Sequence, residues 1–301
     1  MGRVYGERIA GWTADEATSH ALLDHFVEAG GNFVDTANVY SAWVPGHFGG
    51  ESETLIGRWV QSRRGGRDRL LIATKVGMDM PEIGQGLKPA QIERGVEDSL
   101  RRLRIERIDL LYAHRDDPDT ALEDTLAAFD RLVRAGKVRA IAASNYTAER
   151  LEQALAISAR NGLARYECLQ PPYNLLEREP VEGSLAPLCR REGVGIAPYY
   201  SLAMGFLSGK YRRREDFQGR PRAMGLVKYD NARGWRVVET LHGVARRYGV
   251  PPASIAIAWV LAQPGITSAI ASATSTAQLD ELMRACNIKL DDQAVAELSG
   301  R

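Results

Sequence analysis

Short apolar runs alternate with longer amphipathic stretches along most of the chain. The runs are rich in β-branched and aliphatic residues and are almost continuously hydrophobic, which is typical of parallel strands buried on both faces. The strands predicted in this way cover residues 32–35, 70–75, 108–114, 138–144, 168–170, 195–199 and 268–271.

The stretches between these runs have the periodicity of helices. In the first of them Leu22, His25 and Ala29 recur at helical spacing, and Gly30 then supplies a helix-ending signal. Other stretches open with a proline or end before a glycine. The predicted helices cover residues 18–29, 89–103, 120–135, 147–161, 235–248 and 276–285.

Repeated alternation of strand and helix with short connections predicts a parallel α/β sheet. A doubly wound sheet and a (β/α)8 TIM barrel both have this order. A doubly wound dinucleotide-binding sheet would carry a GxGxxG sequence after an early strand, and this chain has none there. A barrel instead places functional residues at the carboxyl ends of several strands. We therefore favour a single barrel domain over residues 1–301.

Composition is consistent with a large core and gives few other clues. The chain has 301 residues, of which 45% are hydrophobic, and a net charge of +1. Its charges are well mixed, so nothing points to nucleic acid. Cys168, Cys189 and Cys286 match no metal or redox spacing, and no apolar run approaches the length of a membrane span. We expect a cytoplasmic protein without a metal or a membrane partner.

Four polar residues at or just after predicted strands suggest chemistry. Asp35 ends one strand and Tyr40 follows it, while Lys75 and His114 end the next two strands. Each alone has an ordinary explanation, since strand ends meet solvent and a histidine can be buried in a core. Together they would bring an acid, a phenol, an ammonium and an imidazole to one mouth of a barrel.

This combination suits reduction of a carbonyl group. Hydride transfer to a carbonyl leaves an alkoxide that must be protonated, and a free tyrosine is a poor acid at neutral pH. A neighbouring ammonium favours phenolate and so lowers the pKa of a tyrosine. Tyr40 is thus predicted as the acid, Lys75 as its modulator, Asp35 as the group that orients Lys75, and His114 as the substrate positioner.

The ordered motifs along the chain resemble the aldo-keto reductase family, whose members have a (β/α)8 barrel and reduce aldehydes and ketones with NADPH. Within the family the chain is most similar to the longer bacterial branch, which also includes proteins resembling potassium-channel β subunits. The motifs are DTANVYS (35–41), GGESETLIGRW (49–59), LLIATKVG (70–77), IDLLYAHRDDP (108–118), GKVRAIAASNY (136–146), QPPYNLLER (170–178), APYYSLAMGFLSGKY (197–211) and ASATSTAQLDEL (271–282).

The resemblance implies a cofactor site. Ser144, Asn145 and Gln170 would hydrogen-bond the nicotinamide carboxamide, and Tyr200 would stack on the nicotinamide ring. The other implied contacts are small residues and a cation at the phosphates, and polar residues at the adenosine end: Ser201, Leu202, Ala203, Gly205, Leu207 and Lys210, then Ser272, Thr274, Gln278 and Glu281.

Two departures from the family pattern affect these expectations. Family members begin with a hairpin and a regular first strand, whereas this chain has MGRVYGERIAGW (1–12), so either 4–9 forms an unusual first strand or the terminus is truncated or rebuilt. Many relatives also carry an arginine near Thr274 that pairs with the 2′-phosphate of NADPH. Hydroxyl groups replace it here, although one of the arginines at 212–214 could compensate. We expect NADPH as cofactor, with NADH possible.

The substrate is less well defined than the chemistry. The loop 41–50 would place Trp43, His47 and Phe48 beside Tyr40, which suggests bulky, apolar or sugar-like carbonyl compounds. Simple packing of Trp43 on the barrel rim is an equally good interpretation. Two functions remain open: an NAD(P)H-dependent reductase of small carbonyl compounds (or the reverse alcohol dehydrogenase), and a nicotinamide-binding regulatory module with little turnover. A homo-oligomer is compatible with both.

Overall fold

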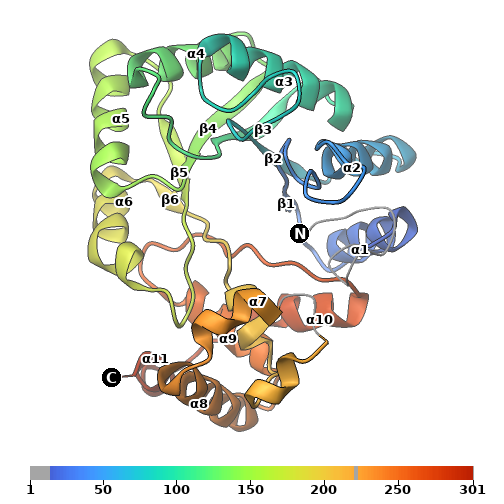
Figure 1. Cartoon of the computed structure of the whole chain (residues 1–301), viewed down its shortest axis with the longest axis vertical. Coiled ribbons are helices and arrows are strands. Elements are labelled where there is room, and N and C mark those ends of the chain that lie inside the picture. The colour runs from blue at the N-terminus through green and yellow to red at the C-terminus, as the bar shows by residue number, and fades with distance from the viewer. Residues whose placement is uncertain (1–13, 220–222, 301) are drawn as a thin grey trace. The chain divides into compact units, whose positions relative to one another are not determined.

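The computed structural model describes residues 14–219 and 223–300. The chain divides into two compact units (Figure 1). The first unit contains Met1–Gln170 and Glu192–Val194, and the second contains Pro171–Arg191 and Gly195–Arg301.

The first unit alternates strands and helices as the sequence predicts. Five predicted strands and four predicted helices are confirmed to within a few residues, and a helix that was not predicted, α2, follows the loop after β1. The strands are β1 (Phe33–Asp35), β2 (Leu71–Val76), β3 (Ile108–Ala113), β4 (Val138–Ser144) and β5 (Tyr166–Gln170), and the helices are α1 (Glu16–Glu28), α2 (Glu51–Ser62), α3 (Pro89–Leu103), α4 (Leu122–Arg134) and α5 (Ala148–Asn161).

Local signals set the limits of these helices. The Asp15 carboxylate accepts a hydrogen bond from the Thr18 amide at 2.7 Å at the start of α1, and the Thr147 hydroxyl accepts from the Arg150 amide at 3.2 Å at the start of α5. Helix α5 ends at Gly162, whose φ of 62° suits a residue without a side chain. These caps agree with the boundaries read from the sequence.

The five strands are parallel and follow one another in sequence order. Asp35 pairs with Ala73, Lys75 with Tyr112, and Ser144 with Gln170. Because the strands are parallel, their carboxyl ends share one edge of the sheet. This arrangement gathers residues that are far apart in sequence at a single edge.

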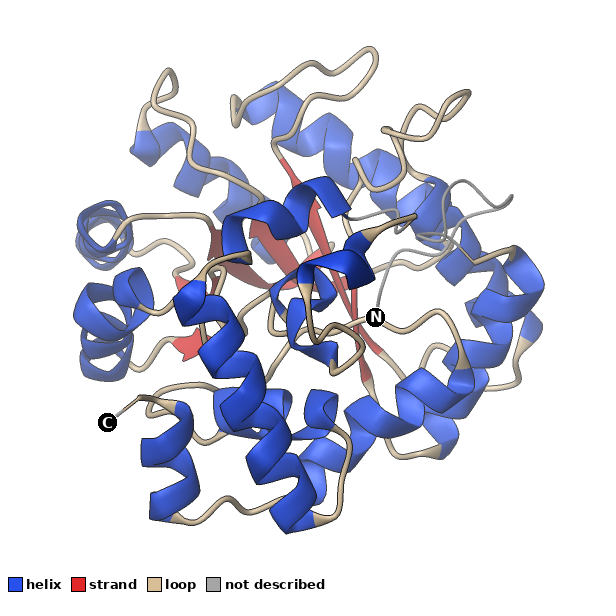
Figure 2. Cartoon of the chain, turned by 60° about the horizontal axis from the view of Figure 1, so that its bottom comes forward, coloured by secondary structure: helices blue, strands red, loops and turns tan. Residues whose placement is uncertain are grey.

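The core of this unit lies on both faces of the sheet. Five of the six residues of β2 are buried. Figure 2 shows the strands in red and the helices in blue. The large side chains of Trp59, Phe129 and Tyr166 are fully buried. Such burial explains the nearly continuous hydrophobic runs of the sequence.

The second unit is mainly helical in the part that the structure describes. Its regular elements are α6 (Ala186–Glu192, whose last residue is counted with the first unit), β6 (Gly195–Ile196), α7 (Ala223–Leu226), α8 (Ala232–Tyr248), α9 (Pro252–Leu261), α10 (Thr276–Arg284) and α11 (Asp292–Leu298). Aromatic side chains hold this unit together: Trp259 stacks on Tyr173 with ring centroids 5.5 Å apart, and Phe217 stacks on Trp235 at 5.8 Å.

A TIM barrel has eight strands, whereas the described residues of this chain contain six. The predicted strand at 268–271 is wrong. Thr267 and Ile270 each donate one backbone bond, to Ile196 and Pro198, and a single bridge joins Ile196 to Ile266. These few bonds do not make a continuous ladder, and β6 is correspondingly short. The possible first strand at 4–9 lies outside the described residues.

Candidate active site

A buried ion pair between Asp35 and Lys75 lies at the carboxyl edge of the first unit. The Lys75 ammonium donates to the Asp35 carboxylate at 2.5 Å, to the Thr36 carbonyl at 2.8 Å and to the Tyr40 hydroxyl at 3.2 Å. The Lys75 side chain is 0% exposed and that of Asp35 is 4% exposed. Three of the four predicted catalytic residues therefore meet at one nitrogen atom. The Thr36 carbonyl was not predicted, because sequence patterns do not show where a backbone carbonyl points.

Lys75 keeps its charge in spite of its burial. Removal from water by itself would lower the pKa of Lys75, but the carboxylate of Asp35 and the phenol of Tyr40 outweigh that effect and raise the pKa above its ordinary value. The ammonium also lies 4.9 Å from the centre of the Tyr40 ring. A cation is thus held against the phenol at neutral pH.

His114 completes the predicted set. Its ring meets the Tyr40 ring edge-on, with centroids 5.9 Å apart, and its amide donates to the Val76 carbonyl at 2.9 Å. Burial, assisted by the positive charges of Lys75 and Arg115, lowers the pKa of His114 to about 3. The imidazole is therefore neutral at pH 7 and able to donate or accept a hydrogen bond.

The three predicted carboxamide contacts of the first unit lie at the same edge. The Ser144 hydroxyl donates to the Gln170 carbonyl at 2.8 Å, and the Asn145 side chain donates to the His114 carbonyl at 2.9 Å. The Gln170 amide group donates to the second oxygen of Asp35 at 2.9 Å. Asn145 has a φ of 60°, a conformation that asparagine adopts more readily than most residues. These bonds tie the edge residues to the Asp35–Lys75 pair.

The loop 41–50 brings one of the predicted substrate residues to Tyr40. The Trp43 ring lies edge-on to Tyr40 with centroids 6.1 Å apart and is 45% exposed, while Phe48 is 69% exposed. His47 shares a hydrogen bond of 3.1 Å with the Ser41 hydroxyl, so it also holds the loop. Trp43 is therefore the member of the predicted set with a contact to the phenol.

The second unit holds the predicted ring-stacking and pyrophosphate residues in one tight loop. Tyr200, Ala203, Met204 and Gly205 all have positive φ, from 48° to 99°. The amides of Ala203, Gly205 and Leu207 already donate to carbonyls of this loop, at 2.7, 2.8 and 3.2 Å. These three amide groups therefore already have acceptors within the loop. In this conformation they do not point free N–H groups at a phosphate.

A cation accompanies this loop. A Cβ atom added to Gly205 would lie 3.6 Å from the Lys210 ammonium, so the absence of a side chain leaves room beside that charge. Small residues and a nearby ammonium fit an anionic group such as a pyrophosphate.

Nearby arginines are engaged with acids in the second unit. Arg214 pairs with Asp230 at 3.2 Å, and Arg213 lies 3.8 Å from Asp216. Compensation by Arg213 or Arg214 for the missing arginine near Thr274 would have to compete with these pairs.

The predicted adenosine residues surround the start of α10. The Thr274 amide and hydroxyl both donate to the Gln278 side chain, at 3.0 and 3.1 Å. The Glu281 carbonyl accepts from the Ser254 hydroxyl at 2.6 Å, and Ser272 is exposed. Thr274 and Gln278 thus form a polar pair that could also bond a ribose or a phosphate.

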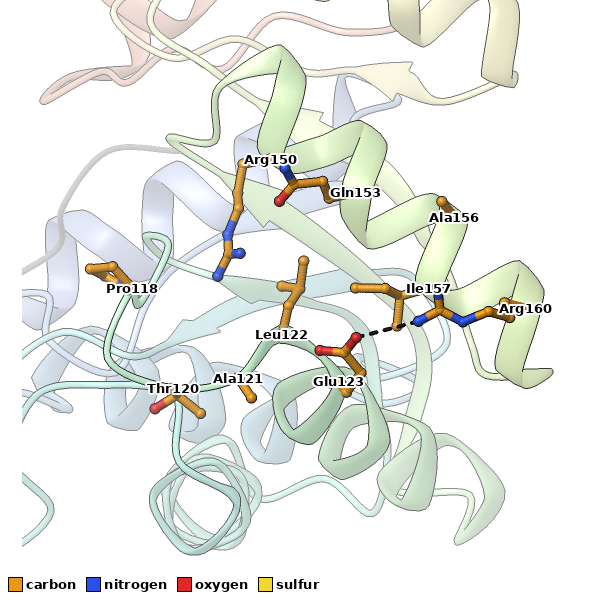
Figure 3. A pocket seen from close by; sticks show the side chains of 10 residues that line it. All are labelled: Pro118, Thr120, Ala121, Leu122, Glu123, Arg150, Gln153, Ala156, Ile157 and Arg160. Carbon is orange, nitrogen blue, oxygen red and sulfur yellow. Dashed lines mark hydrogen bonds and ion pairs between the residues drawn. The ribbon is translucent and has the colours of Figure 1, made fainter.

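A separate groove of about 490 Å³ lies between α4 and α5 (Figure 3). Arg160 forms an ion pair of 3.4 Å with Glu123 there, and Arg150 pairs with Asp116 at 2.9 Å. The groove contains none of the predicted catalytic residues. Its lining residues are Pro118, Thr120, Ala121, Leu122, Glu123, Arg150, Gln153, Ala156, Ile157 and Arg160.

Metal-binding clusters and membrane-spanning helices are absent from the described ranges. Three or more His, Cys, Asp or Glu side chains nowhere gather within them in a way that could hold a metal ion. Within the same residues no helix is both long enough and apolar enough to cross a membrane.

Comparison with known proteins decides the family. The family model described as "Aldo/keto reductase family" matches residues 5–300. The chain belongs to the aldo/keto reductase family. The match spans both units, and membership supports a nicotinamide-dependent oxidoreductase that acts on small carbonyl compounds.

Curated relatives within this family share about a third of their residues with the chain. It is 31% identical to "Protein tas" of Escherichia coli, with 94% of this chain and 88% of the relative covered. It is 33% identical to "Norsolorinic acid reductase stcV" of Emericella nidulans, with 93% and 71% covered. It is 30% identical to "Aldo-keto reductase yakc [NADP(+)]" of Schizosaccharomyces pombe, with 95% and 82% covered.

Proposed function

We propose that this protein is an NADPH-dependent reductase of aldehydes or ketones, which in reverse would oxidise alcohols. One observation carries the proposal: a buried, charged Lys75 bridges Asp35 and the Tyr40 hydroxyl at 2.5 and 3.2 Å. A lysine is rarely buried so completely unless it is paired, and here the partner is Asp35. Here its burial gives the phenol a fixed cationic neighbour.

In the proposed reaction Tyr40 supplies the proton. A bound nicotinamide would supply the hydride to the carbonyl carbon. The Tyr40 hydroxyl gives its proton to the carbonyl oxygen, the product leaves as an alcohol, and the phenolate regains a proton from solvent. Lys75 stabilises that phenolate, Asp35 holds Lys75 in place, and neutral His114 hydrogen-bonds the carbonyl oxygen and orients it.

The cofactor proposal draws on both sets of predicted residues. Ser144, Asn145 and Gln170 are polar and are linked by hydrogen bonds to Asp35 and to the His114 carbonyl, which suits a carboxamide. The loop from Tyr200 to Leu207 with Lys210 suits the ring and the pyrophosphate, and the residues from Ser272 to Glu281 suit the adenosine end. Because the family match covers 5–300, we treat the chain as one functional domain. One relative's name includes NADP(+), which supports this cofactor over NADH.

The substrate proposal rests on the loop after β1. Trp43 is partly exposed beside Tyr40 and offers a flat apolar face, and Phe48 adds a second exposed ring. A planar or bulky carbonyl compound would gain contact area there. The cytoplasmic location stays a prediction.

The decisive experiment is the Tyr40→Phe substitution. We expect kcat for carbonyl reduction to fall about 100-fold or more, because the ring stays while the proton donor is lost. The affinity for NADPH should stay within about twofold. Tryptophan fluorescence during NADPH titration measures that affinity, and a broad panel of aromatic and aliphatic carbonyl compounds measures turnover.

Tyr248→Phe is the matched control, because its hydroxyl bonds Asp291 in the second unit and has no part in the proposed reaction. It should keep wild-type kcat. Equal activity of wild type and Tyr40→Phe would refute the proposed acid. A wild type that binds NADPH tightly but turns over no carbonyl would instead support the regulatory module.

A further inference from the structure

The motif GGESETLIGRW (49–59) contains none of the proposed catalytic residues, yet its polar side chains reach the catalytic strands. Ser52 and Glu53 lie in the first turn of α2, and both are buried. The Ser52 hydroxyl accepts from the Thr36 hydroxyl at 2.8 Å, and the Glu53 carboxylate accepts from the Thr74 hydroxyl at 2.5 Å. Thr36 directly follows Asp35, and Thr74 directly precedes Lys75.

We propose that Ser52 and Glu53 are positioning residues, which hold β1 and β2 from the helix side so that Asp35 and Lys75 meet. The inference rests on the proposed function of that pair. Neighbouring side chains of a strand point to opposite faces of the sheet. Thr74 therefore faces α2 while Lys75 faces the reaction site.

Thr36 connects the two faces. Its amide donates to the Ala73 carbonyl at 2.9 Å, its carbonyl accepts from the Lys75 ammonium at 2.8 Å, and its hydroxyl donates to Ser52. A shift of Thr36 would thus disturb both the pairing of β1 with β2 and the third hydrogen bond of Lys75.

The Glu53 carboxylate has its own counter-ion. The Arg102 guanidinium of α3 donates to Glu53 at 2.7 Å, and Glu53 is 0% exposed. A buried carboxylate with a partner on each oxygen is held in one orientation. The carboxylate also lies in the first turn of α2, where the helix dipole favours a negative charge.

Two glycines of the motif make room for Arg102. A Cβ atom on Gly50 would lie 2.5 Å from the Arg102 side chain, and one on Gly57 would lie 2.2 Å from the Arg102 carbonyl. Gly50 also has a φ of 88°. The motif therefore brings Arg102 to Glu53 and Glu53 to Thr74, one residue before Lys75.

The test compares Thr74→Val with Thr125→Val. Both substitutions remove a buried threonine hydroxyl at nearly constant volume, but the hydroxyl of Thr125, in α4, donates to the Leu87 carbonyl, away from the catalytic strands. We expect Thr74→Val to lower kcat about tenfold, with KM and NADPH affinity within about twofold, because small misplacements of reacting groups are costly. Thr125→Val should keep wild-type kcat, and Thr74→Ser should restore most of it.

A purely structural role predicts a different result. Thr74→Val would then lower the melting temperature and leave kcat unchanged at temperatures where the variant is folded, and that outcome overturns the inference. So does an equal loss in Thr125→Val, or no rescue by Thr74→Ser.

Amide hydrogen exchange at Thr36 gives a readout that needs no turnover. It should become about tenfold faster in Thr74→Val and in Ser52→Ala, and stay unchanged in Thr125→Val. Unchanged exchange at Thr36 in the first two variants refutes the inference even if the wild type reduces no carbonyl. If the wild type reduces no carbonyl but exchange at Thr36 is faster in Thr74→Val and Ser52→Ala, only the proposed function is refuted.

Discussion

At the scale of single residues, the site combines one side chain that keeps its charge on burial with another that loses it. Lys75 has an acidic and a phenolic neighbour that outweigh its burial and raise its pKa, whereas burial, assisted by nearby cations, lowers the pKa of His114 to about 3. Both groups lie beside the same phenol. Burial favours the neutral form of both groups, and only Lys75 has neighbours that outweigh this effect and keep the group charged.

The neutral state of His114 predicts a dependence of stability on pH. Between pH 6.5 and about 3 the unfolded chain binds a proton at this residue and the folded chain does not, so stability is lost as the pH falls through this window. The contribution of one such group approaches about 1.4 kcal/mol per pH unit.

His114→Gln stays neutral at every pH and should show a shallower loss. Urea unfolding of wild type and His114→Gln at pH 7, 6 and 5 measures how much each protein loses in free energy of unfolding. The carboxylates are the same in both proteins, so their contribution cancels when the two losses are compared. Parallel stability curves would contradict a depressed pKa at His114.

At the scale of elements, α2 is held by close backbone approach as well as by side chains. The Cβ of an alanine at Gly57 would lie 2.2 Å from the Arg102 carbonyl and 2.8 Å from the Leu103 carbonyl carbon, both backbone atoms of the α3 end. Backbone atoms cannot rotate away as a side chain can. Gly57 is therefore required by helix packing.

Gly57→Ala should lower the free energy of unfolding by about 1–3 kcal/mol, because α2 and α3 must separate to admit the new methyl group. Gly243→Ala in α8 is the matched control, since nothing lies within 4 Å of its added Cβ atom. Helix propensity alone should make that variant more stable by about 0.5–1 kcal/mol. Urea denaturation measures both. A gain of stability in Gly57→Ala similar to that of Gly243→Ala would rule out the close approach.

At the scale of the whole molecule, the proposed cofactor should act as a stabiliser. A ligand that binds only the folded state at 100 times its Kd adds about 2.7 kcal/mol to the free energy of unfolding. We expect NADPH to raise the melting temperature accordingly, and Tyr40→Phe to respond like the wild type, because the hydroxyl it loses is assigned to proton transfer.

The same measurement with NADH tests cofactor preference. Hydroxyl groups near Thr274 do not neutralise a 2′-phosphate, and Arg213 and Arg214 are engaged with acids. The affinities for NADPH and NADH should therefore differ by about tenfold or less, or about 1.4 kcal/mol. A preference of a thousandfold would show that a cation contacts the phosphate in the complex.

Sequence alone determined the features that depend on local pattern. Hydrophobic runs located β1 to β5 of the first unit, and helix-ending glycines and an opening proline helped to locate four of its five helices. Burial on two faces and capping leave signals within a few residues. Order along the chain also placed Asp35, Lys75 and His114 at strand ends. Their shared edge followed from parallel strands, and in the structure Lys75 and His114 contact Tyr40 while Asp35 pairs with Lys75.

Only the tertiary structure decided what depends on distant partners. The segment 268–271 is apolar enough for a strand but makes too few backbone bonds beside 196–198. Arg213 and Arg214 pair with acids, and Ser52 and Glu53 accept hydrogen bonds from two threonines. No spacing rule connects these residues. Such contacts are set when strands and helices pack, because a hydrogen bond between distant segments depends on where both segments lie and leaves no periodic trace in either one.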